Sequence, residues 1–288
     1  MNVYRSPAEM PRTERSVAIG TFDGVHRGHR RVLDAAKGAG LRTTVVTFWP
    51  HPRTVLGNRV ELLTTLERRL ELVEKAGVED ALVVTFDAGI AQLEPAEFAD
   101  AFLAAIGTRV IATGERFRFG RGASGDVRTL SRLGFDIRAV PIVEDVSSTA
   151  IRGLLRAGDV VGAAGLLGRP AEVEGVVVLG DQRGGTLGYP TANLDVPPDL
   201  LVPAYGIYAG VALGHRAAVS IGINPHYGGD ERRVEPYLLD YEGDLYGRRL
   251  VVELWRRLRD EQAFPTEAAL VEQIARDVEA TRAAVPPV

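Results

Sequence analysis

The sequence predicts a two-domain protein, in which an α/β domain with a parallel sheet precedes a small all-β domain that ends in one helix. The chain has 288 residues, enough for two hydrophobic cores at roughly 100–200 residues per domain. Its first half alternates short β-branched runs with helix-like segments, whereas its second half has closely spaced strand-like runs between Gly, Pro and Asp clusters. The change falls near Pro170, so we predict domains at 1–170 and 171–288.

The predicted strands of the first domain are short and almost continuously apolar, which is typical of a parallel, doubly wound sheet covered on both faces. These strands are Val17–Gly20, Thr43–Phe48, Ala81–Phe86, Arg109–Thr113 and Asp136–Val140. The predicted helices are Arg27–Gly40, Leu66–Gly77, Pro95–Ile106, Asp126–Gly134, Thr149–Ala157 and Asp159–Leu167.

In the second domain no helical pattern separates the strand-like runs, which favours an antiparallel sheet or small barrel. The runs are Val173–Leu179, Gly206–Leu213, Ala217–Ile221, Val234–Tyr241 and Leu250–Leu254. A terminal helix follows. Thr266 is its predicted N-cap, and Leu270, Ile274 and Val278 share one face at i, i+4 spacing.

Composition excludes several classes of protein. The net charge of −4 gives no support to nonspecific binding of nucleic acid or of an anionic membrane. The chain has no cysteine, which excludes disulfides, thiolate metal sites and cysteine nucleophiles. Met1–Glu14 is polar, and no run approaches the ~18 apolar residues of a membrane span. We therefore expect a cytoplasmic protein whose partners are small molecules; the oligomeric state stays open.

The sharpest local motif is Gly20–His29, GTFDGVHRGH, which follows a predicted strand and opens a predicted helix. A helix N-terminus in that place offers free N–H groups and a positive dipole end to phosphate. His26 and His29 can lie on one face of the first turn and donate hydrogen bonds to phosphate oxygens. A metal site is the alternative interpretation, but the chain has five histidines and no evident third ligand.

Three more motifs stand at the predicted ends of later strands: Thr47–Pro52 (TFWPHP), Gly114–Gly120 (GERFRFG) and Ser147–Arg152 (SSTAIR). The carboxyl ends of parallel strands meet at one edge of a sheet, so one crevice can gather all of them. Ser148 and Thr149 would cap a helix and bind phosphate, and Arg152 would add a planar donor fork.

The pair GxFDGxHxGH and SSTxxR resembles the nucleotidyltransferase superfamily, whose domain is Rossmann-like. TFWPHP and GERFRFG narrow the resemblance to the bacterial bifunctional riboflavin kinase/FAD synthetase family. Class I aminoacyl-tRNA synthetases share the first motif, but they also need a lysine-rich KMSKS-type loop and a tRNA-binding domain, neither of which we find. The resemblance covers nearly the whole chain, from about Val17 to Arg282.

The resemblance implies that the first domain transfers the adenylyl group of ATP to FMN, giving FAD and pyrophosphate. His26 and His29 would stabilise the phosphates and the transition state. The nucleotide would also contact Gly20, Phe22, Asp23, Gly24, Gly28, Ser148, Thr149 and Arg152. The flavin would contact His51, Pro52, Phe117 and Phe119.

The second domain carries Gly180–Leu194, GDQRGGTLGYPTANL, whose glycines indicate a loop held close to a ligand. Thr191 and Asn193 would point to the same side of an extended segment, and their oxygens suit Mg2+ beside phosphates. No P-loop motif is present in the sequence. A glycine-rich hairpin is the alternative.

GYPTAN resembles the PTAN signature of the riboflavin kinase domain, a six-stranded barrel with a C-terminal helix. Five downstream segments agree: Gly206–Tyr208, Ile221–Gly229, Val234–Asp240, Leu245–Gly247 and Leu258–Phe264. The resemblance makes Glu235 the general base for the riboflavin 5′-hydroxyl, with ATP as co-substrate and Mg2+ as cofactor. It also assigns Gly180, Gly184 and Gly188 to the nucleotide, Thr191 and Asn193 to the metal, and Tyr208 to the flavin.

Several residues depart from the family pattern: Trp49, Arg116, Ala150, Gly185 and the pair His226–Tyr227. Arg116 replaces an acidic or amide residue, and Ala150 replaces an arginine. Both residues lie in motifs that the resemblance assigns to the adenylylation site, so both changes bear on adenylylation rather than on phosphorylation.

Two alternatives follow. One is a riboflavin kinase whose first domain is inactive or re-purposed, and the other is a non-catalytic flavin-binding or regulatory protein. The presence of His26, His29 and Glu235 favours catalysis.

Overall fold

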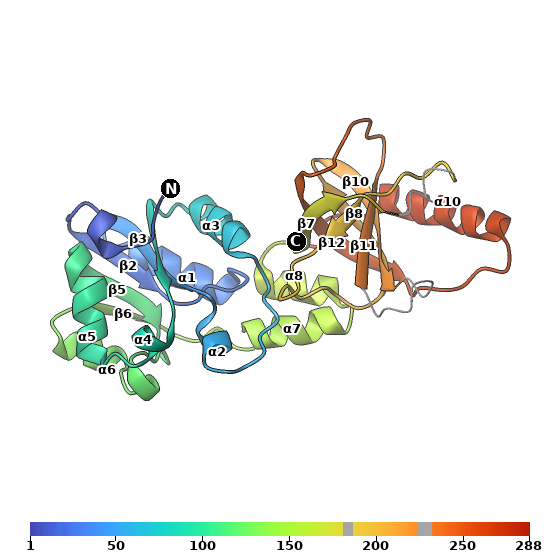
Figure 1. The fold of residues 1–288 in the computed structure, drawn as a ribbon. Helices are drawn as coiled ribbons and strands as arrows, with labels where there is room; N and C mark the ends of the chain where they lie inside the picture. The colour runs from blue at the N-terminus through green and yellow to red at the C-terminus, as the bar shows by residue number, and fades with distance from the viewer. Residues whose placement is uncertain (181–186, 224–231) are drawn as a thin grey trace. The chain divides into compact units, whose positions relative to one another are not determined.

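The computed structural model describes residues 1–180, 187–223 and 232–288, which form two compact units, Met1–Ser148 and Thr149–Val288 (Figure 1). The units divide at the start of α7 (Ser148–Arg156), and α8 (Val160–Leu167) follows in the second unit. The Leu155 carbonyl of α7 accepts a hydrogen bond of 3.1 Å from Ala204 N in that unit. The domain limits of 1–170 and 171–288 stay a prediction, because compactness alone does not define a folding unit.

The first unit is built on a six-stranded, entirely parallel sheet, which confirms the predicted α/β class. Its strands are β1 (Asn2–Tyr4), β2 (Arg15–Ile19), β3 (Arg42–Trp49), β4 (Asp80–Thr85), β5 (Thr108–Gly114) and β6 (Asp136–Val140). Their order is β1-β4-β3-β2-β5-β6, so the direction of winding reverses between β2 and β5. In open α/β sheets that reversal opens a crevice at the carboxyl ends of the strands.

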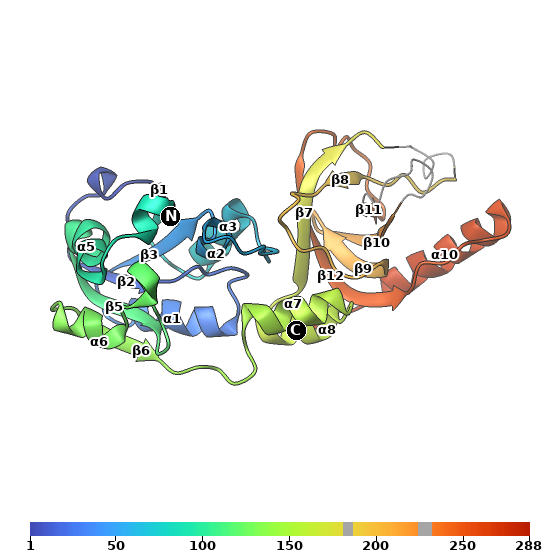
Figure 2. The same cartoon turned by 60° about the horizontal axis from the view of Figure 1, so that its bottom comes forward.

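Helices cover both faces of this sheet (Figures 1 and 2). Alternate strand residues are buried on opposite faces: Ala18 packs with α1 and α3, whereas Val17 and Ile19 pack with the segment around Phe98. The elements are η1 (Pro7–Glu9), α1 (Arg27–Lys37), α2 (Pro52–Val55), α3 (Leu66–Lys75), α4 (Ala88–Ala91), α5 (Pro95–Phe98), η2 (Ala99–Leu103), η3 (Ala104–Ile106), η4 (Arg121–Ala123) and α6 (Val127–Arg132).

The first unit differs from the predicted elements in several places, including the short helices η1, α2, α4 and η4, which were not predicted. The single helix predicted over Pro95–Ile106 is instead one α-turn, a π-helical segment and a 3-10 turn. It ends at Gly107, whose φ of 82° is left-handed and where a Cβ would lie 2.3 Å from the Thr13 carbonyl oxygen. The strand β1 was not predicted, since its three residues carry no periodicity and only their pairing with β4 makes them a strand.

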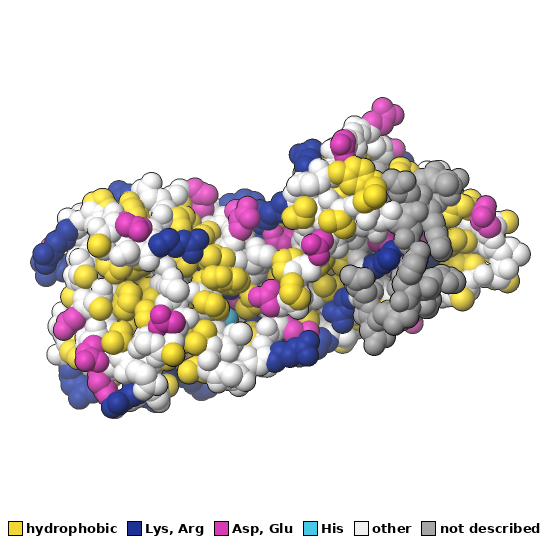
Figure 3. Space-filling model, viewed as in Figure 1, with side chains coloured by type: hydrophobic (Ala, Val, Ile, Leu, Met, Phe, Trp, Pro, Cys, Tyr) yellow, Lys and Arg dark blue, Asp and Glu magenta, His cyan; other side chains and the backbone are white. Residues whose placement is uncertain are grey.

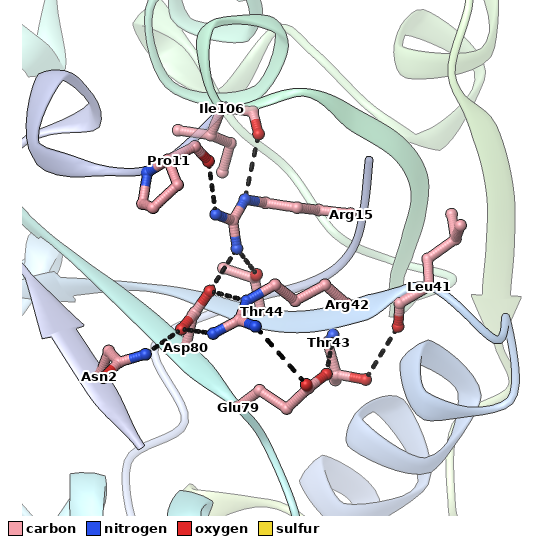
Figure 4. A network of polar contacts seen from close by, with 10 residues as sticks. All are labelled: Asn2, Pro11, Arg15, Leu41, Arg42, Thr43, Thr44, Glu79, Asp80 and Ile106. Carbon is pink, nitrogen blue, oxygen red and sulfur yellow. Dashed lines mark hydrogen bonds and ion pairs between the residues drawn. The ribbon is translucent and has the colours of Figure 1, made fainter. Parts of the chain in front are cut away.

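A buried polar network ties four strands together at their amino ends, opposite the crevice (Figure 4). Arg15 and Asp80 have fully buried side chains and form an ion pair. The remaining Arg15 donors reach the carbonyls of Ile106 and Pro11 and the hydroxyl of Thr44. Asp80 also accepts hydrogen bonds from Arg42 at 2.6 and 2.9 Å and from Asn2 at 3.0 Å. Burial raises the pKa of Asp80, but the hydrogen bonds from these partners outweigh it and hold the pKa well below its usual range.

The second unit contains a six-stranded antiparallel sheet, and this confirms the predicted all-β class. Its elements are β7 (Ala171–Val178), β8 (Asn193–Asp195), β9 (Gly206–Ala212), β10 (His215–Ile223), β11 (Arg232–Leu238), β12 (Arg249–Arg259) and α10 (Glu267–Ala283). The strand order is β11-β10-β9-β12-β7-β8. Ala192, just before β8, donates a backbone hydrogen bond of 2.9 Å to Pro236 O of β11. The two edge strands of the sheet, β8 and β11, therefore meet, and the sheet forms a nearly closed barrel.

The terminal helix α10 contacts β9 and β10 of the barrel (Figure 2). Thr266 is its N-cap and accepts a hydrogen bond of 3.2 Å from Ala269 N, as predicted. Along the inner side of α10, Asp277 pairs bidentately with Arg259 of β12. Strand β12 continues five residues past the predicted end at Leu254, with bulges that the sequence pattern does not reveal.

None of the helices in the described part of the chain combines the length and apolarity of a membrane span. On the face shown in Figure 3, basic and acidic side chains of the described residues are mixed, in keeping with the small net charge.

Candidate functional site

A cavity of about 600 Å³ opens in the first unit at the point where strand order reverses. Ile19 and Gly20 at the end of β2 and Thr113 and Gly114 at the end of β5 line it. The predicted residues Gly20, Phe22, His26, Gly28, His29, Pro52, Phe117 and Phe119 are all in its wall. This is where an open α/β sheet binds its ligand.

The turn between β2 and α1 is conformationally strained. Phe22, Gly24 and Val25 have φ values of 51°, 83° and 40°, and both non-glycine residues are fully buried. At Gly24 an added Cβ would lie 2.7 Å from Leu63 Cδ1, so only glycine fits. Left-handed backbone at large residues persists only where the surroundings impose it, and it concentrates at functional sites.

The two histidines are stacked at the N-terminus of α1, with ring centroids 3.6 Å apart and an interplanar angle of 17°. His26 is the N-cap, and its Nδ1 accepts a hydrogen bond of 3.3 Å from His29 N. A neutral imidazole that accepts at Nδ1 carries its proton on Nε2, which is therefore a donor. Gly28 permits this arrangement, because an added Cβ would lie 3.1 Å from the His26 ring.

Asp23 and Gly24 lie in the same turn but are not among the residues that line the cavity. The Asp23 carboxylate is buried and accepts hydrogen bonds from Leu63 N at 2.9 Å and Thr64 N at 3.2 Å. Its backbone carbonyl accepts one of 3.0 Å from Ser148 Oγ. Asp23 therefore anchors the turn to the segment before α3.

Part of the cavity wall is aromatic. Phe117 and Phe119 are stacked with centroids 5.7 Å apart, and Phe98 lies 5.8 Å from Phe119. Phe48 and Phe86 complete this wall with a perpendicular contact of 5.9 Å. Such a surface suits a planar ring system.

Of the two loop residues predicted to contact the flavin, one lines the cavity and the other does not. Pro52 lines the cavity, whereas His51 is buried behind it as the N-cap of α2, where its Nδ1 accepts from Arg53 N at 3.2 Å. Arg116, the residue that departs from the family pattern, is exposed and does not line the cavity. Arg118 does line it, and its guanidinium lies 3.8 Å from the Asp126 carboxylate.

In the barrel, three of the residues predicted for the second domain, Thr191, Asn193 and Glu235, belong to segments that come together where the two edge strands approach. The bond from Ala192 N to Pro236 O brings the Thr191–Asn193 segment beside Glu235 of β11. Tyr189 and Tyr237 make a perpendicular ring contact of 5.5 Å across the same junction. The Asn193 side chain lies directly over Gly180, where an added Cβ would fall 2.1 Å from its amide nitrogen.

Glu235 is half-buried and pairs across the sheet with Ser220 of β10. Its Oε1 lies 3.8 Å from Arg233 Nη1. A second carboxylate, Glu261, lies against Gly222 of β10. Burial raises the pKa of Glu261, Arg259 opposes the rise, and the charge of Glu235 adds to it.

The remaining predicted residues are scattered. Tyr208 is fully buried and donates a hydrogen bond of 2.6 Å to Ala204 O, which places it in the barrel core rather than on an open surface. Gly188 is exposed with a left-handed φ of 85°. Thr149 and Arg152 lie on α7, and their contact with a triphosphate stays a prediction. Gly184, Gly185 and the pair His226–Tyr227 lie outside the described residues.

Comparison with known proteins identifies both halves of the chain. A FAD synthetase family model matches residues 9–152, and a riboflavin kinase family model matches residues 167–285. The bifunctional riboflavin kinase/FMN adenylyltransferase of Listeria monocytogenes is 35% identical over 286 residues, which cover 93% of this chain and 91% of that protein.

The chain belongs to the bifunctional riboflavin kinase/FMN adenylyltransferase family. The Escherichia coli K12 member is 35% identical and the Pseudomonas fluorescens member 37% identical, and each alignment covers more than 90% of both chains. A crystal structure described as a macrolide-efflux protein from Streptococcus pneumoniae superposes with a TM-score of 0.87 at 31% identity, and covers 98% of each chain.

Membership confirms the predicted family and activities: the protein is a transferase with riboflavin kinase and FMN adenylyltransferase activities, and it uses ATP.

The prediction did not identify the hydrogen bonds that hold the loop after β2 in place. Thr47 Oγ1 donates to Thr21 O at 3.1 Å and Thr113 Oγ1 donates to Ile19 O at 3.2 Å, so the ends of β3 and β5 fix the β2 loop. Threonine at the end of an apolar strand is a weak signal for such a bond. Arg69, buried under the same loop, has no signal in the sequence at all.

Proposed function

We propose that FMN is adenylylated in the cavity that starts at His26 and His29, and that riboflavin is phosphorylated beside Glu235. The observation that carries the first assignment is the stacked histidine pair at a helix N-terminus, at the switch point of a parallel sheet. The second rests on the bond from Ala192 N to Pro236 O, which places the Thr191–Asn193 segment beside Glu235 at the barrel junction.

In adenylylation, an oxygen of the FMN phosphate forms a bond to the α-phosphorus of ATP. The bond from that phosphorus to the bridging oxygen of the β-phosphate breaks, and pyrophosphate leaves with the electron pair. The Nε2–H of His26 and the amides at the start of α1 would donate to the phosphate oxygens as charge builds up. No covalent enzyme intermediate is needed, so catalysis rests on positioning and charge stabilisation.

The aromatic end of the cavity would hold a planar ring. We assign the isoalloxazine ring to the wall formed by Phe117, Phe119 and Phe98, beside Pro52. The apolar side chains of Val140, Ile142 and Val143, which also line the cavity, would take adenine. Arg118 also lines this cavity and would contact phosphate or the polar edge of a ring.

In riboflavin phosphorylation, Glu235 would accept the proton of the 5′-hydroxyl while that oxygen attacks the γ-phosphorus of ATP and ADP leaves. The Thr191 hydroxyl and the Asn193 amide oxygen fit Mg2+, which takes oxygen ligands and keeps several waters. Bound there with the nucleotide, Mg2+ would neutralise phosphate charge. Gly180 leaves the space that the Asn193 side chain occupies. We place both reactions in the cytoplasm, with small molecules as the only substrates.

A chromatographic time course with Mg2+ and ATP, run once with riboflavin and once with FMN, tests the proposal. We expect riboflavin to pass through FMN to FAD, and supplied FMN to pass to FAD. FMN that accumulates without reacting would leave the kinase assignment intact and favour an inactive or re-purposed first unit. No turnover of either flavin would favour a binding protein and overturn both assignments.

A further inference from the structure

Arg69 is the one buried cation beneath the proposed adenylylation site among the residues described. It lies on α3, and its side chain is fully buried. Its Nη2 is 3.6 Å from the Asp23 carboxylate, which is 1% exposed. Its Nη1 donates a hydrogen bond of 3.5 Å to the Phe48 carbonyl at the end of β3. The guanidinium carbon lies 5.6 Å from the centre of the Trp49 ring.

Burying the Arg69 guanidinium in this position costs folding free energy. Burial lowers the pKa of Arg69, and the Asp23 carboxylate only partly opposes that effect. Nε and Nη2 have no hydrogen-bond acceptor in the described structure. A buried charge that is incompletely hydrogen-bonded does not add stability efficiently, because desolvation offsets the attraction to its partner. Its position therefore calls for a reason other than stability.

The contacts of Arg69 supply that reason. Asp23 belongs to the strained turn of Phe22–Val25, and His26 follows that turn directly. Phe48 lines the cavity at the end of β3. Arg69 thus links the turn after β2 to the end of β3, although it does not line the cavity itself. The Trp49 departure from the family pattern gives the cation a ring to lie against.

We propose that Arg69 is a positioning residue for adenylyl transfer: by pairing with Asp23, it holds the Phe22–Val25 turn in the strained conformation that presents His26 to the nucleotide. The inference rests on the proposed role of the cavity. It makes Arg69 act through Asp23 and the backbone, with no contact to substrate. A displacement of His26 by about 1 Å would slow transfer by up to ~100-fold.

The test compares Arg69→Met, Arg69→Lys, Asp23→Asn and the double variant with Arg68→Met as the matched control. Arg68 is the preceding residue of α3 and pairs with Glu71 at 2.5 Å. For each protein, kcat and KM for FAD formation are measured from FMN and ATP, and kcat for FMN formation is measured from riboflavin. Near-UV circular dichroism at the assay temperature reports whether each variant is folded.

We expect Arg69→Met to lower kcat for FAD formation by roughly 10- to 100-fold, with KM for ATP changed far less and FMN formation unchanged. Arg69→Lys keeps the charge, so its kcat for FAD formation should fall less than that of Arg69→Met. Arg68→Met should have the kcat of wild type. The double variant should be no slower than the worse single variant, because both act on one turn.

Folded Arg69→Met protein with wild-type kcat for FAD formation overturns the inference. So does a double variant whose fold-loss in kcat equals the product of the two single-variant losses, because the two residues would then act independently. If Arg69→Met unfolds, Arg69→Lys and Asp23→Asn decide by the same kcat comparison. Wild-type protein that forms no FAD overturns the proposed function, and this inference with it. That outcome is distinct, because wild type then fails before any variant is compared.

Discussion

Replacing Asp80 by Asn should destabilise the first unit strongly without touching its active site. The carboxylate is fully buried at the amino ends of the strands, whereas the cavity lies at their carboxyl ends. Asn keeps the size and can still accept from Asn2, but it leaves the Arg15 guanidinium buried without its counter-charge (Figure 4).

Removing one partner of a buried ion pair costs about 3–5 kcal/mol. Most of this comes from Arg15, whose side chain is 0% exposed; Arg42 is 39% exposed, so solvent screens its share. For a unit of this size, each kcal/mol shifts Tm by about 2–4 °C, which predicts a fall of roughly 10 °C. Glu14→Gln is the matched control, since Glu14 pairs with Arg109 at 2.8 Å with both side chains mostly exposed. It should cost less than about 1 kcal/mol.

Thermal unfolding of the three proteins at pH 7 measures both effects. Because the folded-state pKa of Asp80 is depressed, its stabilisation is present above its unfolded pKa of about 4 and is lost as pH falls below that value. The difference in Tm between wild type and Asp80→Asn should therefore narrow below about pH 4. Equal Tm values for Asp80→Asn and Glu14→Gln at pH 7 would refute this reasoning.

Three further changes separate the roles of single residues. Glu235→Gln should lower FMN formation by about 100-fold or more while FAD formation from supplied FMN persists; loss of both would contradict separate sites. Arg116→Asp should leave FAD formation within twofold or so, because Arg116 is exposed outside the cavity wall, and a larger change would give it a role. Tyr208→Phe should cost about 1 kcal/mol of stability through the lost bond to Ala204 with KM for riboflavin unchanged; a raised KM would restore Tyr208 as a flavin contact.

The features that sequence analysis predicted correctly are carried by neighbours along the chain. Gly20–His29 holds the turn glycines and the first helical residues in ten consecutive positions, so its place between β2 and α1 follows from local rules. The strained backbone of Phe22–Val25 within it depends on tertiary contacts instead. The apolar runs predict the strands, and Thr266 predicts the start of α10. The single helix predicted over Pro95–Ile106 failed because apolar periodicity does not distinguish an α-helix from a π-helical segment.

The sequence by itself determined the two fold classes, the family and the residues available for chemistry, because hydrophobic period and contiguous motifs are local properties. Only the tertiary structure decided which partners satisfy the buried charges. Arg15 meets Asp80 from 65 positions away, and Asp23 turns its carboxylate toward Leu63 and Thr64 rather than the cavity. A buried charge must find a partner, but its own neighbours along the chain do not say which distant strand or helix supplies it.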